Sequence, residues 1–207
     1  ISLYSNLDMI GRAFGFFLLT AAAQKISGLF GQSKGDEAGQ LVCDLFRCSF
    51  VFGMIVPAIL VPSSIPLAHW FGADDATIKM AFSYLTPLNG ASCITCIYLM
   101  WCGCLQAEGR SILVAIVQIS SLVANMAIFC PLFLLVFKWG IIGAAFATII
   151  AEFIPATILT ILFFSGKFGV KPNWRGLFRK FSPHTTEALK TGLSQLIMNI
   201  SRSIPSI

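Results

Sequence analysis

One carboxylate lies inside an otherwise uncharged apolar stretch, and its polar neighbours make it the first candidate for chemistry. Residues 139–166 contain Glu152 and no other Asp, Glu, Lys or Arg. On a helix, Thr148 lies one turn before Glu152 and Pro155 follows it on the same face. A carboxylate in apolar surroundings is costly unless it is protonated, paired or hydrated. Glu152 is therefore a candidate cation-binding residue, and an ion pair with a basic residue such as Arg202 is an open alternative.

The composition indicates that the elements positioning this acid are membrane helices. Hydrophobic residues make up 57% of the chain and charged residues only 11%, with a mean hydropathy of +0.83. Uncharged or nearly uncharged runs long enough to span a bilayer recur without the alternation of barrel strands. They cover 48–72, 80–107, 111–137 and 139–166, with a fifth span from about Met9 to Gly31 and a sixth beginning near Ala188. The sequence predicts an all-α, polytopic transmembrane bundle.

Polar residues follow helical spacing on three further spans. The strips are Thr20, Gln24 and Ser27; Thr86, Asn89, Cys93 and Cys96; and Gln118, Ser121 and Asn125. Such strips must face other helices or a water-filled cavity. Hydrogen bonding between helices alone would explain them, but their presence on separate helices favours a shared interior cavity. Its candidate lining residues are Gln24, Asn89, Gln118, Ser121 and Arg202.

Other residue patterns predict packing rather than chemistry. Small residues at 140, 143, 147 and 151 form a stripe that lets a neighbouring helix approach closely. Prolines inside the spans predict kinks. Cysteines 93, 96, 102 and 104 fall within one apolar span, away from both histidines, so we expect neither a metal site nor disulfides. His69 and Asp74 fit a short acyltransferase spacing, but no phosphate-binding block accompanies them, so we do not expect an enzyme.

The distribution of Lys and Arg predicts the orientation of the bundle. One set of alternating connections holds Lys34, Arg47, Arg110, Lys167, Lys171, Arg175, Arg179 and Lys180, whereas the other holds Arg12, Lys79 and Lys138. The positive-inside rule therefore places the loops at 32–47, 106–110 and 167–187 in the cytoplasm. The net charge of +5 is explained by this bias, without nucleic-acid binding.

The longest break between spans divides the chain into three expected parts. Residues 167–187 combine basic and aromatic side chains, as an amphipathic segment on a membrane surface would. We expect a transmembrane bundle at 1–166, a cytoplasmic linker at 167–187 and the beginning of a second bundle at 188–207. The chain begins without methionine and ends within an apolar helix, so we expect a piece of a longer protein.

Four segments, taken together and in order, resemble the multidrug and toxic compound extrusion (MATE) transporters. They are KISGLFGQSKGDEAGQ (25–40), LQAEGRS (105–111), NMAIFCPLFLLV (125–136) and WGIIGAAFATIIAE (139–152). The resemblance implies twelve helices in two six-helix lobes, with a substrate cavity between the lobes. On that template the chain holds helices two to six of the N-lobe and the start of helix seven. Helix one and most of the C-lobe would be supplied by the rest of the protein.

The resemblance also implies secondary active efflux of organic cations, drugs or metabolites, driven by antiport of protons or sodium ions without another cofactor. In one branch of the family the coupling residues include an acid before a proline on helix five and a threonine on helix six. Here the helix-five pair reads Cys130-Pro131, and Thr148 matches the threonine. Another branch relies on an acid in helix seven, where this chain offers Arg202.

Many members have Gln at the position of Glu152. The coupling candidates are therefore Glu152, as an acid relocated from position 130, with Thr148 and Asn125. A structural ion pair and a passive exchange of Gln for Glu are the alternatives for Glu152. The expected partners are the bilayer, of the plasma membrane or an organelle, and a small organic substrate. A lipid-linked oligosaccharide flippase of the same superfamily and a fragment that does not transport are the alternative functions.

Overall fold

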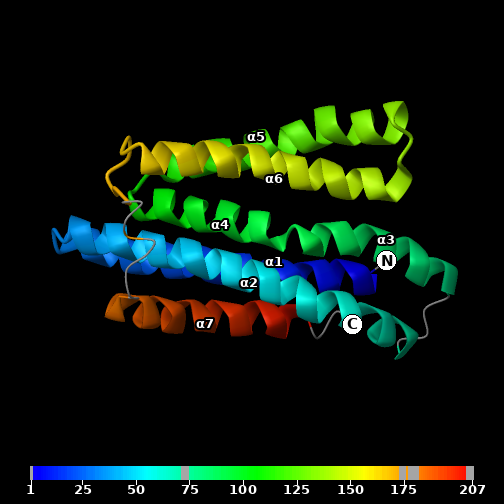
Figure 1. The fold of residues 1–207 in the computed structure, drawn as a ribbon, viewed down its shortest axis with the longest axis horizontal. Helices are drawn as coiled ribbons and strands as arrows, with labels where there is room; N and C mark the ends of the chain where they lie inside the picture. Colours follow the sequence, from blue (N-terminus) through cyan, green and yellow to red (C-terminus); the bar gives the residue numbers. More distant parts are fainter. Residues whose placement is uncertain (1, 71–74, 173–175, 177–181, 204–207) are drawn as a thin grey trace.

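The computed structural model describes residues 2–70, 75–172, 176 and 182–203, and every regular element in them is helical. The elements are α1 (Ser2–Gly31), α2 (Gly35–Trp70), α3 (Asp75–Gly90), α4 (Ser92–Ala107), α5 (Ser111–Ala124), the π-helical turns η1 (Asn125–Phe129) and η2 (Leu132–Val136), α6 (Gly140–Phe164) and α7 (Pro183–Ser203). The helices lie roughly alongside one another (Figure 1). The predicted all-α bundle is confirmed.

The apolar helices of the described residues follow most of the predicted spans, but α2 begins at Gly35, so most of 32–47, predicted as a connection, is helical. Four stretches are long and apolar enough to cross a membrane: Arg12–Gly31, Gly35–Ser63, Ser111–Val136 and Ile142–Phe164. A fifth, from Phe82 to Ala107, consists of α3 and α4 joined at a 54° bend. The predicted break near Pro87 is thus a real bend, because α3 ends at Gly90 and α4 begins at Ser92.

Proline has different consequences on the other helices. Pro131 lies between η1 and η2, where the helix widens into π-helical turns. Pro155 is accommodated inside α6, which continues to Phe164, and α2 continues through Pro57, Pro62 and Pro66. Proline lacks the backbone amide that donates within a helix, but not every proline here widens or breaks its helix. The effect depends on the packing around each one.

Helices α1, α4 and α6 end with the same backbone conformation. Ser33, Gly109 and Gly166 adopt positive φ values of 59°, 75° and 71° just beyond these helices. In each case the next amide bonds to a carbonyl five residues earlier, as Lys34 N does to Leu29 O at 3.0 Å. This arrangement satisfies terminal carbonyls and reverses the chain sharply. All three turns lie at the same end of the bundle, beside the start of α7 (Figure 1).

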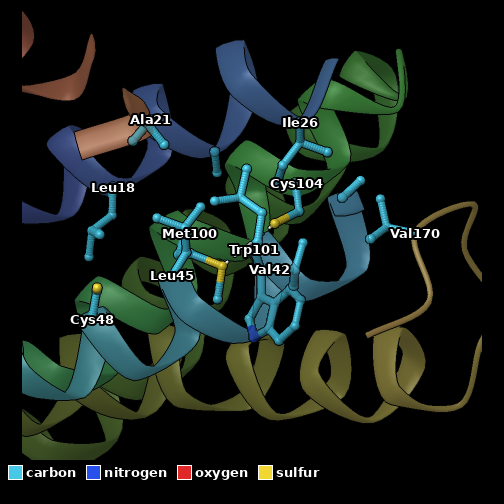
Figure 2. Close-up of a cluster of buried hydrophobic side chains, with 14 of the residues drawn as sticks. Leu18, Ala21, Ile26, Val42, Leu45, Cys48, Met100, Trp101, Cys104 and Val170 are labelled. Atoms are coloured by element: carbon cyan, nitrogen blue, oxygen red, sulfur yellow. Dashed lines mark hydrogen bonds between the residues drawn. The ribbon is translucent and has the colours of Figure 1, made fainter. Parts of the chain in front are cut away.

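The core forms where α1, α2, α4 and α6 meet. Trp101 is fully buried, stacks on Phe163 with ring centroids 4.5 Å apart, and donates from Nε1 to Thr160 Oγ1 at 2.8 Å. Figure 2 shows side chains of α1, α2 and α4 gathered around this indole, with Val170 arriving from the segment after α6. The polar edge of the tryptophan is thereby satisfied inside an apolar cluster.

Glycines allow the helices around this core to cross closely. A Cβ at Gly103 of α4 would lie 2.4 Å from the backbone oxygen of Leu19 on α1, and a Cβ at Gly53 of α2 would lie 2.3 Å from Cys93 Cα on α4. On α6, Gly143, Ala147 and Ala151 of the predicted stripe are buried. These close approaches hold α4 at the centre of the bundle.

Two segments that the sequence singled out lie partly beyond the described residues. The segment from His69 to Asp74 includes 71–74, and the amphipathic interpretation of the linker concerns 173–175 and 177–181, all outside the description. After the linker, α7 begins at Pro183, before the expected boundary at 188, and packs alongside α1 (Figure 1).

Candidate functional site

Glu152 has two polar partners from different helices. Arg12 of α1 donates from Nη1 to Glu152 Oε1 at 2.8 Å, and Thr95 of α4 donates from Oγ1 to Oε2 at 2.5 Å. The Glu152 side chain is 10% exposed, whereas that of Arg12 is 31% exposed. The carboxylate is therefore more deeply buried than its guanidinium partner.

Arg12 is the basic partner that sequence reasoning missed. The charge count placed Arg12 in a connection, but it lies inside α1. Arg12 and Glu152 are 140 residues apart in sequence, so no local spacing connects them. The proposed partner Arg202 lies near the end of α7, and its side chain is outside the described part of the structure. The observed ion pair joins Glu152 to Arg12.

The remaining coupling candidates lie next to the ion pair. Asn125 Nδ2 donates to Thr148 Oγ1 at 3.2 Å, so these two residues from η1 and α6 are in direct contact. Thr148 Oγ1 also donates to Ala144 O, and the Cys130 thiol approaches Asn125 Oδ1 at 3.5 Å. Position 130, where one branch of the resembled family has an acid, thus lies beside the same polar group.

A π-helical turn positions Asn125. The turn begins at Asn125 and precedes Cys130-Pro131, where proline has no amide to donate. Short π-helical segments inside α-helices often occur at functional sites, because the extra residue changes the direction of neighbouring side chains. One turn earlier, Ser121 Oγ donates to Ala151 O at 2.7 Å. The polar strip of this helix therefore faces α6.

These residues surround a pocket of about 200 Å³. Its lining residues are Arg12, Tyr98, Gln118, Ser121, Leu122, Asn125, Thr148, Ala151 and Glu152. The structure thus brings together the predicted residues of the fifth and sixth helices of the resembled lobe. Arg12 and Tyr98 are additions that the sequence did not single out.

Two predicted lining residues lie elsewhere. Gln24 is exposed on α1, and its backbone carbonyl accepts a hydrogen bond from Ser27 Oγ at 2.9 Å. Asn89 is buried near the end of α3, where its carbonyl accepts from Ser92 Oγ at 2.6 Å beside the bend. Neither is among the residues that line the pocket. Helical spacing therefore grouped the polar residues into strips but did not show which strips line this pocket.

The pocket presents carboxylate, hydroxyl and amide groups around the Arg12–Glu152 ion pair. Carboxylate, hydroxyl and amide oxygens can bind a proton or an alkali cation, but this donor set does not suit a transition metal. Within the described residues, no three His, Cys, Asp or Glu side chains gather as metal ligands. The cysteines at 93, 96, 102 and 104 all lie on α4 as thiols that are not joined in disulfides.

Known proteins share both the sequence pattern and the fold. Residues 1–132 match the sequence profile of the MatE family. An inward-facing multidrug resistance MATE family transporter of the MOP superfamily is 19% identical, with a TM-score of 0.90 over 99% of this chain and 46% of that one. A MOP superfamily transporter from Pyrococcus furiosus, described as having a binding pocket of reverse polarity, is 21% identical, with a TM-score of 0.82 over 96% of this chain and 43% of that one.

A MATE protein in complex with MaL6 is also 21% identical, with a TM-score of 0.83 over 96% of this chain and 43% of that one. This chain therefore spans less than half the length of these solved structures. A search of curated protein sequences finds no match. The family profile covers well over half of the chain, and the helical bundle agrees with the solved MATE structures. The chain belongs to the MatE family.

Proposed function

We propose that this chain forms most of one lobe of a secondary active exporter of small organic molecules, driven by antiport of protons or sodium ions. Membership of the MatE family supports a transporter. The observation that supports ion coupling is the Glu152–Arg12 ion pair, which lies in a pocket with Asn125 and Thr148. Organic cations, drugs or metabolites are the substrate classes expected from the sequence. The missing part of the cavity would come from a second lobe.

The proposed coupling is a competition for one carboxylate. Arg12 occupies Glu152 Oε1 in the described arrangement. A proton or sodium ion that binds Glu152 must displace the guanidinium, and a cationic substrate that uses this carboxylate must do the same. Since Glu152 can neutralise only one positive charge at a time, binding of the coupling ion and of the substrate exclude each other. Mutual exclusion is the requirement for antiport.

In this scheme Thr95 has one role near the carboxylate, and Asn125 with Thr148 has another. Thr95 of α4 holds Glu152 Oε2 by a hydrogen bond while Oε1 exchanges its binding partners. Asn125 and Thr148 supply oxygen atoms beside the carboxylate that can coordinate a sodium ion or orient a water molecule. Because α1 and α6 contribute the two halves of the ion pair, movement of either helix would change the competition.

The proposal is tested by transport with a full-length protein that contains this lobe. The protein is reconstituted in liposomes, and ethidium efflux is followed under an imposed pH or sodium gradient. The wild type is expected to respond to one of the gradients. Glu152→Gln should abolish the response, because the amide oxygen can accept a hydrogen bond from Thr95 but the neutral side chain neither takes up a proton nor balances the charge of a sodium ion. Asp36→Asn, at an exposed site in the first turn of α2, is the control.

Two results would contradict the proposal in different ways. A wild-type protein that ignores both gradients would argue against antiport altogether. Gradient-driven efflux that persists unchanged in Glu152→Gln would leave antiport possible but remove Glu152 from the coupling. Size-exclusion chromatography and helical circular dichroism of each variant separate a loss of coupling from a loss of folding.

A further inference from the structure

A second buried acid, Asp44, lies away from the pocket at the end of the bundle where α7 begins. Its side chain is fully buried on α2. Oδ1 pairs with Arg47 and accepts from Gln40 Nε2 at 3.1 Å, both on the same helix. A buried carboxylate is tolerated only when its charge and its lone pairs are satisfied. The contacts within α2 account for one of the two oxygens.

The other oxygen binds the start of α7. Asp44 Oδ2 accepts from Ser182 N and from Thr185 Oγ1, both at 2.8 Å. The hydroxyl of Thr185 is buried, so it has little access to water as an alternative partner. Gln40 adds a further tie, because its Nε2 lies 3.1 Å from Gly176 O. One acid on α2 thus joins both the connection and the first turn of α7.

The charge of Asp44 also suits this position. Helix N-termini carry partial positive charge and amide donors without intrahelical partners, and a carboxylate there is stabilising. Ser182 precedes the first residue of α7, and its own Oγ accepts from His184 N at 3.3 Å. The N-terminal end of α7 is therefore capped twice, locally by Ser182 and from the neighbouring helix α2 by Asp44.

Two further contacts hold α7 against α1. Lys25 of α1 forms an ion pair with Glu187, and its hydrogen bond and charge lower the pKa of the Glu187 carboxyl. Further along, a Cβ at Gly192 would lie 2.7 Å from the backbone oxygen of Phe17. Figure 1 shows α7 lying beside α1 and α2 over this length.

We propose that Asp44 is a positioning residue that latches the first turns of α7 onto α2. Residues 182–192 then move together with the bundle of α1, α2 and α4. The sequence, by contrast, predicted that 188–207 belong to the following lobe. In this arrangement, motion between lobes must take place beyond Gly192, since the preceding turns are tied to the first bundle. The latch does not depend on Glu152 or on the nature of the substrate.

Hydrogen–deuterium exchange of this chain in detergent micelles tests the latch directly. Asp44→Asn should raise the exchange rate of the amides of 182–190 by about tenfold or more, because a hydrogen bond to a charged group is lost. Amides of α4 around Trp101 should not change. Asp36→Asn, the same substitution at an exposed site in the first turn of α2, is the matched control and should leave 182–190 unchanged.

A second pair of variants keeps the test valid if Asp44→Asn does not fold. Thr185→Val removes the hydroxyl that reaches Oδ2 and should increase exchange in 182–190 severalfold. Thr185→Ser retains the hydroxyl and should remain close to the wild type. Unchanged exchange in both Asp44→Asn and Thr185→Val, or equal exchange in the Ser and Val variants, would overturn the latch.

A transport readout separates positioning from simple stability. This step rests on the proposed function and uses the full-length protein in liposomes. Asp44→Asn should lower the maximal rate of ethidium efflux severalfold while leaving its KM unchanged, because Asp44 does not line the pocket. An altered KM at an unchanged maximal rate would contradict a positioning role. Failure of the wild type to transport would reject the proposed function, whereas the exchange experiment would still test the latch.

Discussion

At the scale of single residues, the Arg12–Glu152 pair makes a quantitative prediction about stability. Removing either charge leaves the other partly buried without its partner, so Arg12→Gln and Glu152→Gln should each lower the free energy of unfolding by about 1–3 kcal/mol. The value is below that of a fully buried pair because the Arg12 side chain is 31% exposed. Unfolding in mixed detergent micelles measures the free energy.

The double variant distinguishes the pair from two independent residues. Arg12→Gln combined with Glu152→Gln should lose less stability than the sum of the single variants, with a coupling of about 1–2 kcal/mol. Strictly additive losses would show that the two charges do not stabilise each other. Thr95→Val should have a smaller effect, since it removes one hydrogen bond and no charge.

Residue identity alone could predict that Glu152 needs a partner but not which one. The apolar run and the spacing to Thr148 were visible in the sequence, and the structure places both at one pocket. Arg12 was counted with the connections because it lies near the start of the span predicted from about Met9. Whether such an arginine points to water or into the bundle depends on how the helices around it pack. Packing between segments 140 residues apart leaves no local signal.

At the scale of elements, the α1–α4 crossing depends on the absence of a side chain at Gly103. Gly103→Ala would bring a methyl group against the backbone of Leu19, where a Cβ lies only 2.4 Å from the oxygen. Because backbone cannot move aside as a flexible side chain can, the helices must separate. We expect a loss of about 1–3 kcal/mol in the free energy of unfolding. The same detergent unfolding experiment measures it.

Gly28 of α1 provides the matched control for this crossing. A Cβ at Gly28 meets no atom within 4 Å. Gly28→Ala should therefore be neutral or stabilise the chain by up to about 1 kcal/mol, since alanine is the better helix former. Equal effects at Gly103 and Gly28 would indicate that helix propensity, rather than close packing, determines the result.

Element positions were largely predictable, whereas their bends were not. Runs without charges locate membrane helices because burying a charge in lipid is costly, and the described spans follow these runs. Proline marks possible bends without setting their size. Pro87 precedes a 54° bend, whereas Pro155 lies inside an unbroken α6. The difference arises from which neighbouring groups replace the lost hydrogen bond, and this depends on the tertiary structure.

At the scale of the whole molecule, the two ends of the bundle differ in charge. The turns after α1, α4 and α6 and the start of α7 lie at one end, and Lys34, Arg110, Lys167 and Lys171 belong to the segments beside these turns (Figure 1). The end of α2, the start of α3 and the turn between η2 and α6 lie at the opposite end (Figure 1). With Arg12 paired inside the bundle, that end retains Lys79 and Lys138. The structure thus sharpens the charge asymmetry on which the predicted orientation depends.

This asymmetry predicts which turns can be reached from outside a cell. Ser33 and Lys138 are both exposed turn residues with positive φ, and they lie at opposite ends of the bundle. A membrane-impermeant maleimide should label Lys138→Cys in intact cells but label Ser33→Cys only after permeabilisation, because basic connections are retained in the cytoplasm. The unsubstituted chain, with its native cysteines buried or half-buried, sets the background. The opposite labelling pattern would invert the orientation, and with it the side of the membrane on which Asp44 holds α7.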